Sequence, residues 1–116
     1  MEISSKRKSF FNALTEFAAD GQEAGNIMLE FCKIVEKSNK LHNLTSIKNL
    51  DDMLIKHVLD SLSIKNFLFG KNILDVGSGA GLPSIPLAVT CPNKEFSLLD
   101  ANNKKIIFLN HVKINL

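Results

Sequence analysis

The stretch ILDVGSGAGLP, residues 73–83, constrains this chain most, because three glycines at alternate positions follow a short apolar run. The apolar run predicts a buried strand. Gly77, Gly79 and Gly81 allow a sharp turn after the strand and let a ligand lie against the main chain. Two prolines close to the loop predict that a helix begins there, since the first-turn N–H groups of a helix have no helical partner. This order is typical of a ligand-binding turn in an α/β fold.

The residues after the loop continue the same pattern. Residues 95–100, EFSLLD, predict a second strand, and residues 104–115 predict another helix. Strand, helix, strand and helix with short links imply a parallel pair with a right-handed crossover, the opening of a doubly wound α/β sheet. A parallel sheet is normally buried on both faces and contains more than two strands. We therefore expect a truncated chain, with an N-terminal helical region at 1–66 and the first half of a Rossmann-like domain at 67–116.

The first two-thirds of the chain predict helices. Ser4 or Ser5 is expected to cap the first helix, and Asp20-Gly21 is expected to end it. Apolar residues at spacings of three and four predict a second helix over residues 23–39. A third helix should follow a loop, with Asp51 and Asp52 at the positive end of its dipole.

Composition excludes several classes of protein. The chain has 116 residues, with 14 Lys plus Arg against 12 Asp plus Glu, so its charge does not demand a nucleic-acid partner. It contains no apolar run long enough to cross a membrane, and its start lacks a signal-peptide core. Cys32 and Cys91 are far apart and are expected to be reduced thiols in a cytoplasmic protein. No metal site is expected.

The glycine spacing separates two kinds of cofactor. Dinucleotide sites use GxGxxG, whereas this loop is GxGxG, with Leu82 where the third glycine should fall. Asp75 would repel a pyrophosphate but suits the sulfonium and ammonium groups of S-adenosylmethionine. Asp100, 23 residues after Gly77, is placed to accept hydrogen bonds from ribose hydroxyls of either cofactor. The pattern favours S-adenosylmethionine, with a nicotinamide cofactor and a glycine turn without a ligand as the alternatives.

Three segments together carry a resemblance to a known family. They are NLTSIKNLDDMLIKHVLDSL at residues 43–62, ILDVGSGAGLPSIPLA and FSLLDANNKKIIFL. Their order and spacing closely resemble the bacterial 16S ribosomal RNA guanine-N7 methyltransferases, also called the glucose-inhibited division protein B family. The resemblance covers about residues 10–116. It implies a Rossmann-like S-adenosylmethionine-dependent methyltransferase with an N-terminal helical extension, acting as a monomer on N7 of one guanine in the small-subunit decoding region.

The resemblance also implies cofactor contacts at particular positions. Loop contacts fall on Gly77 and Leu82, and ribose and adenine contacts fall on Asp100, Ala101 and Asn102. The argument from charge and backbone approach adds Asp75, Gly79 and Gly81. Further family contacts would lie beyond Leu116, which leaves a non-catalytic RNA- or ribosome-binding remnant as an alternative.

Methyl transfer to guanine N7 needs no general base, so we assign no catalytic residue. Guanine N7 has a free lone pair at neutral pH, so the enzyme needs only to align N7, the methyl carbon and the sulfur. His57, Asp60 and Ser61 share one helix face and could either face the cofactor or RNA, or form a local histidine–aspartate hydrogen bond. The basic run at 6–8 and the lysines at 33, 37 and 40 could contact RNA phosphates or form a solvated, salt-bridged face.

Overall fold

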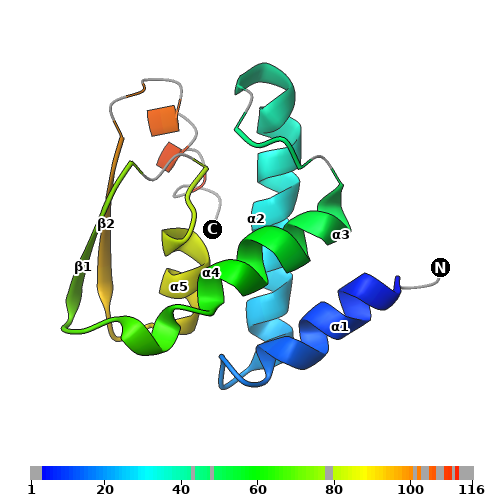
Figure 1. Cartoon of the computed structure of the whole chain (residues 1–116), viewed down its shortest axis with the longest axis horizontal. Helices are drawn as coiled ribbons and strands as arrows, with labels where there is room; N and C mark the ends of the chain where they lie inside the picture. Colours follow the sequence, from blue (N-terminus) through cyan, green and yellow to red (C-terminus); the bar gives the residue numbers. More distant parts are fainter. Residues whose placement is uncertain are drawn as a thin grey trace.

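A helical region packs beside a two-stranded parallel sheet, with one short helix between them (Figure 1). The computed structural model describes residues 4–42, 44–47, 49–77, 80–100, 102, 105–106, 109–110 and 112. Helix α5 contacts α2 and α4 of the helical region and also contacts strand β2. The sheet therefore joins the rest of the molecule through α5.

The first two helices pack against each other, and the turn between them differs from the expected one. Ser4 caps α1 (Ser5–Leu14) by accepting a hydrogen bond from the backbone N–H of Arg7, as predicted. However, α1 already ends at Leu14, and Asp20-Gly21 begins α2 (Gly21–His42) instead of ending α1. The Asp20 carboxylate accepts from the backbone N–H of Glu23 at 3.0 Å. The N-capping preference of aspartate therefore outweighs the helix-breaking tendency of the pair.

The third predicted helix is one continuous helical stretch with a change of winding. It begins as α3 (Leu50–Met53), widens to a π-helix over Leu54–Leu59 and ends as α4 (Asp60–Leu62). The Asn49 side chain caps it by accepting from the backbone N–H of Asp52 at 3.1 Å. A single 3₁₀ turn, η2 (Lys65–Phe67), then leads to the sheet.

The strand–helix–strand prediction is confirmed. Strand β1 (Asn72–Val76), helix α5 (Ser84–Thr90) and strand β2 (Glu95–Leu99) follow one another, and the strands pair in parallel from Asn72↔Glu95 to Val76↔Leu99. Beyond β2, the described residues 105–106, 109–110 and 112 are helical, in agreement with the predicted last helix. The architecture is a small α/β arrangement with one parallel pair.

One hydrophobic core runs through both regions. Its large, fully buried side chains come from α1, α2, the helical stretch over residues 50–62, α5 and the last helix, and they include Phe10, Leu14, Met28, Phe31, Leu54, Leu62, Leu87 and Val112. Cys32 and Cys91 are also buried and are free thiols, as predicted. Burial raises the pKa of the Cys32 thiol to about 12, which keeps it protonated and unreactive at neutral pH. Among the described residues, no helix is long and apolar enough to cross a membrane.

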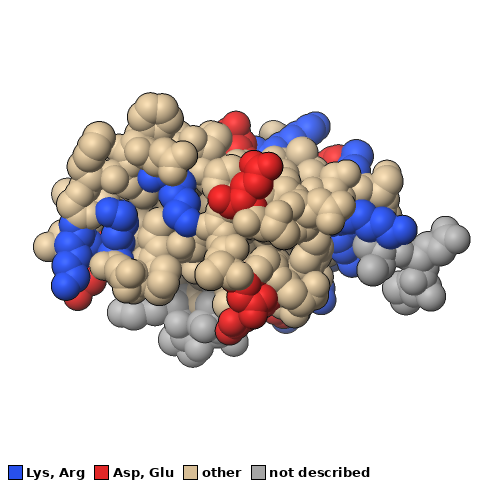
Figure 2. Space-filling view, turned by 90° about the horizontal axis from the view of Figure 1, so that it is seen from below, with Lys and Arg blue, Asp and Glu red and all other residues tan. Residues whose placement is uncertain are grey.

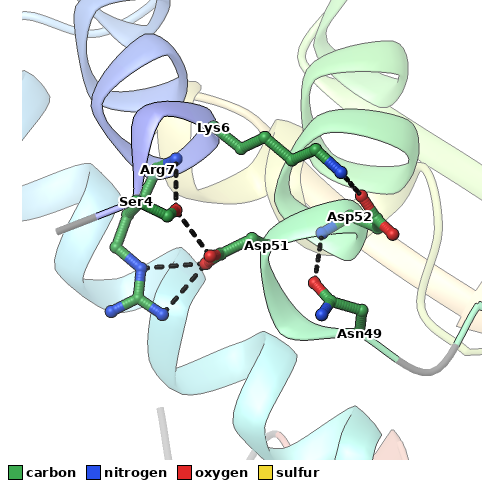
Figure 3. A network of polar contacts seen from close by, with 6 residues as sticks. All are labelled: Ser4, Lys6, Arg7, Asn49, Asp51 and Asp52. Carbon is green, nitrogen blue, oxygen red and sulfur yellow. Dashed lines mark hydrogen bonds and ion pairs between the residues drawn. The ribbon is translucent and has the colours of Figure 1, made fainter.

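A cluster of charged groups clasps the start of α1 to the start of α3 (Figure 3). The Arg7 guanidinium contacts Asp51 Oδ1 through Nε at 3.0 Å and Nη2 at 2.9 Å, and Ser4 Oγ donates to Asp51 Oδ2 at 2.6 Å. Lys6 Nζ pairs with Asp52 Oδ1 at 2.5 Å. Two cations of the basic run 6–8 therefore hold two helices together, which favours the salt-bridged interpretation of that run.

The charged cluster of Ser4, Lys6, Arg7, Asp51 and Asp52 should make the free energy of unfolding depend on pH in the acidic range. Hydrogen bonds from Ser4 and Arg7 lower the pKa of Asp51, and the Lys6 ammonium lowers the pKa of Asp52. A carboxylate with a lowered folded-state pKa stabilises the fold above its unfolded-state pKa of about 3.9, and this contribution disappears as the pH falls through the folded-state pKa. We expect Asp51→Asn to lower the urea midpoint near pH 6, and the difference from wild type to shrink as the pH falls below about 3.9.

The midpoints are measured by far-ultraviolet circular dichroism across this pH range. Higher salt should shrink the difference at neutral pH, because these groups are partly exposed and their attraction is screened. A difference that stays constant from neutral to acidic pH would show that the Asp51 charge does not stabilise the fold.

Candidate cofactor-binding site

The carboxyl ends of the two strands meet at one edge of the sheet, at the upper left of Figure 1. The backbone N–H of Gly77 donates to the carbonyl of Leu99 at 2.7 Å, which extends the pairing by one residue beyond β1. Gly77 then turns the chain with φ of +79°, a left-handed conformation that favours glycine. The predicted sharp turn after the first strand is therefore present.

A cavity of about 500 Å³ opens at this edge. Its walls combine apolar side chains with one glycine and one carboxylate: Val76, Gly77, Leu98, Leu99, Asp100 and Ile106. Two residues predicted from the sequence, Gly77 and Asp100, thus line the same cavity although 23 positions separate them. This is the crevice outside the strand ends where open α/β sheets bind their ligands.

The segment after β2 orients the Asp100 carboxylate. Asp100 Oδ1 accepts from the backbone N–H of Asn102 at 2.8 Å, forming a tight turn. Asn102 in turn caps the last helix, because its side-chain oxygen accepts from the N–H of Lys105 at 3.3 Å and its carbonyl accepts from the N–H of Ile106 at 3.0 Å. Asn102 therefore supports the acidic residue and helps to fix the helix that brings Ile106 to the cavity.

Asp75 supports the loop rather than lining the cavity. Its Oδ2 accepts a hydrogen bond from Ser84 Oγ at 2.6 Å, and Ser84 is buried in the first turn of α5. This bond joins β1 to α5 across the glycine loop. The Asp75 carboxylate thus reaches from β1 to α5.

Gly81 and Leu82 lie behind the loop. Gly81 has φ of +86°, and a Cβ atom there would lie 2.5 Å from Ile85 Cδ1 and 3.4 Å from Leu109 Cδ2. Gly81 therefore lets the loop pack closely against α5 and the last helix. Leu82 is half-buried against the core and does not line the cavity. Gly79 and Ala101 lie outside the described residues.

Sequence reasoning missed the apolar walls of the cavity. Val76 directly precedes Gly77, and Leu98 and Leu99 directly precede Asp100. Their position next to predicted site residues at the strand ends could have identified these three as cavity walls. Ile106 could not be found in this way, because only the turn at Asn102 brings its helix to the edge.

His57 bonds to Thr45 and not to Asp60, the partner in one of the two alternatives. The Nε2 atom of His57 lies 2.7 Å from Thr45 Oγ1, while Ser61 Oγ donates to the His57 carbonyl at 2.6 Å. Burial lowers the pKa of His57, and the Asp60 charge opposes this shift. The local histidine–aspartate hydrogen bond is thus replaced by a bond to the loop before α3. The described residues contain no group of three or more side chains able to hold a metal ion.

Comparison with known proteins identifies close relatives. Residues 25–116 match the family model described as rRNA small subunit methyltransferase G. The chain is 53% identical over 95 residues to the ribosomal RNA small subunit methyltransferase G of Nitrosococcus oceani, which covers 82% of this chain and 44% of the relative. It is 48% identical over 100 residues to the protein of that name from Legionella pneumophila, covering 86% and 47%. The chain thus spans less than half the length of these relatives.

The packing at Gly81 generates a test of the loop. Gly81→Ala should destabilise the chain by about 1–2 kcal/mol through its positive φ, and by about 1–3 kcal/mol more because the new methyl group meets Ile85. Gly70→Ala is the matched control, because Gly70 has φ of +81° but a Cβ there has no neighbour within 4 Å.

Both free energies of unfolding come from urea titrations. Equal losses at the two positions would contradict the close packing of Gly81 against α5. Adding Ile85→Val to Gly81→Ala removes the Cδ1 atom that lies closest and should recover part of the loss.

Proposed function

The chain belongs to the rRNA small subunit methyltransferase G family, and from this premise we propose that it forms the cofactor-binding half of an S-adenosylmethionine-dependent methyltransferase. The acceptor is N7 of a guanine in 16S ribosomal RNA, in the decoding region of the small subunit. Because the chain spans 44–47% of the first two relatives, further contacts to both substrates would come from sequence that these relatives have in addition. The reaction belongs in the cytoplasm, and the enzyme acts as a monomer.

The observation that carries this proposal is the meeting of Gly77 and Asp100 at one cavity. A positive-φ glycine at the end of β1 leaves the backbone uncovered, and an acidic residue directly follows β2. This pairing suits a nucleoside, whose ribose would lie across the strand ends and donate hydrogen bonds from its hydroxyl groups to the carboxylate.

The residues of the cavity fit S-adenosylmethionine. Val76, Leu99 and Ile106 offer apolar surface to the adenine ring, and Asp100 offers acceptors to the ribose hydroxyls. A carboxylate at this place also favours a cationic ligand over an anionic one. When bound, S-adenosylmethionine supplies an electrophilic methyl group on a positively charged sulfur.

The part of the reaction assigned to this chain is positioning. Asp100, held by the N–H of Asn102, fixes the ribose, and Gly77 lets the ligand approach the main chain. Asp75 keeps β1 and α5 in register through Ser84, so that the glycine loop holds its shape. N7 of guanine attacks through its own lone pair, which is why the proposal assigns no general base.

Calorimetric titration of S-adenosylmethionine into the chain tests the cofactor assignment. Asp100→Ala should weaken binding at least about tenfold, since it removes charge-assisted hydrogen bonds worth about 1.5–3 kcal/mol each. Glu95→Ala is the matched control, because Glu95 is exposed and begins β2, at the end of the strand opposite Asp100. It should leave the affinity unchanged.

Three other outcomes would each overturn a part of the proposal. Equal losses for Asp100→Ala and Glu95→Ala would remove Asp100 from the cofactor site. Tighter binding of NADH than of S-adenosylmethionine would favour a nicotinamide enzyme. A folded chain that binds ribosomal RNA but neither cofactor would favour a non-catalytic remnant.

A further inference from the structure

An exposed aromatic and basic surface lies at the amino ends of the strands, at the end of the sheet opposite the cofactor cavity. We call it the amino-end surface, and it consists of Phe67, Phe69, Lys71 and Lys94. Phe69 is 85% exposed, the largest value among the exposed large hydrophobic side chains of the described residues, and Phe67 is 73% exposed. Large aromatic side chains held this far into solvent are unusual and mark contact sites.

The backbone that carries the two phenylalanines is firmly anchored. Leu68 between them is extended, with φ of −84° and ψ of 125°, and its side chain packs against the core. Because side chains alternate along an extended chain, Phe69 is directed away from the side on which Leu68 packs. Phe67, the last residue of the 3₁₀ turn, is also exposed. On one side, Lys65 Nζ donates to the carbonyls of Phe17 and Thr90.

The other side of this segment is held from β2. Lys94, directly before that strand, donates through Nζ to the carbonyl of Gly70. The aromatic rings are thus presented by a fixed backbone, which lowers the entropy that a ligand must overcome on binding.

Positive charge gathers around the two rings. Residues 61–74 contain Lys65 and Lys71 but no Asp or Glu, and Lys94 adjoins them through Gly70. In the view from below, blue atoms gather at the left, over the part of the molecule that holds η2 and the strand starts (Figure 2). Glu95, the first residue of β2, is the neighbouring carboxylate. The surface therefore combines stacking rings with an excess of cations.

We propose that the amino-end surface binds unpaired nucleotides of the RNA substrate. Two bases stack on Phe67 and Phe69, and the phosphates lie near Lys71 and Lys94. Aromatic rings flanked by cations are the general means of holding single-stranded RNA without reading its sequence. The inference rests on the proposed function, because that function supplies RNA as the partner.

The place of the surface fits a positioning role. Strands β1 and β2 each have five residues, so their two ends are separated by roughly 13 Å at about 3.3 Å per residue. A nucleotide on Phe67 or Phe69 cannot be the one that meets the methyl group at the other end. The surface would instead hold a neighbouring part of a folded RNA while its target base reaches the cofactor edge.

The first experiment measures fluorescence anisotropy of a fluorescein-labelled oligoadenylate of about twelve nucleotides, at low salt, against the whole chain. The Phe67→Ala/Phe69→Ala double variant should bind at least about tenfold more weakly, and Phe67→Tyr/Phe69→Tyr should retain wild-type affinity. Phe67→Leu/Phe69→Leu separates stacking from general apolar contact and should be weakened like the alanine pair.

The charge and the stacking are tested separately. Lys71→Ala should reduce the slope of log affinity against log salt by about 0.7, whereas Lys56→Ala, an exposed lysine of the π-helix, should leave it unchanged. Because the chain has no tryptophan, Phe69→Trp introduces a single reporter whose fluorescence should be quenched by a stacked base.

Titration of S-adenosylmethionine into the same variants keeps the two proposals apart. Cofactor affinity should be unchanged when the two phenylalanines are replaced. If wild type binds the cofactor but the RNA affinity of the alanine and tyrosine pairs is equal, the amino-end surface is not an RNA site and the proposed function stands. If the alanine pair instead abolishes self-association without changing RNA affinity, the rings cover a protein contact and the RNA proposal is wrong.

Discussion

The parallel pairing of β1 with β2 is the constraint on which the candidate site depends. Parallel strands place both carboxyl ends at one edge, and the register Val76↔Leu99 brings the residues that follow each strand together. The hydrogen bond from Gly77 to Leu99 carries the pairing into the glycine loop. A shift of one residue would exchange the two faces of β2 and turn Leu98 away from the helices. The cavity is thus a consequence of register as much as of residue identity.

Helix α5 connects this pairing to the helical region. Ser84 at its start holds Asp75 of β1, and Thr90 at its end accepts through its carbonyl from Lys65. The buried side chain of Leu87 joins the core formed by the N-terminal helices. The helical region therefore does more than precede the sheet in sequence, because it supports the helix on which the shape of the glycine loop depends.

The sheet has two unlike faces in the described chain. Ile73, Phe96 and Leu98 lie on the more buried face, whereas Leu74, Val76 and Leu99 are exposed on the other. Strands of a parallel sheet are apolar on both sides because both faces are normally covered. Because both faces are apolar, the strands could be predicted from their apolar runs, but the sequence did not indicate which face of each strand is buried.

The glycine motif shows how different residues of one motif come to do different work. All of Asp75, Gly77 and Gly81 suggested cofactor contact when only their spacing was known. In three dimensions Gly77 lines the cavity, Asp75 bonds to Ser84, and Gly81 makes room for Ile85. Spacing identifies where a loop turns, but the direction of each side chain depends on what packs behind it.

The sequence by itself determined the order of strand, helix and strand, the cap at Ser4, the helix start with Asp51 and Asp52 in its first turn, and the acidic residue after the second strand. These features depend on local periodicity, capping and turn chemistry, which neighbours in the sequence decide. Only the tertiary structure decided the partner of His57, the helix start at Asp20, the walls of the cavity and the exposure of Phe67 and Phe69. Most of these features depend on contacts between segments that are distant in the sequence. The start of α2 depends on a competition between two local preferences of Asp20-Gly21, so no single local pattern specifies it.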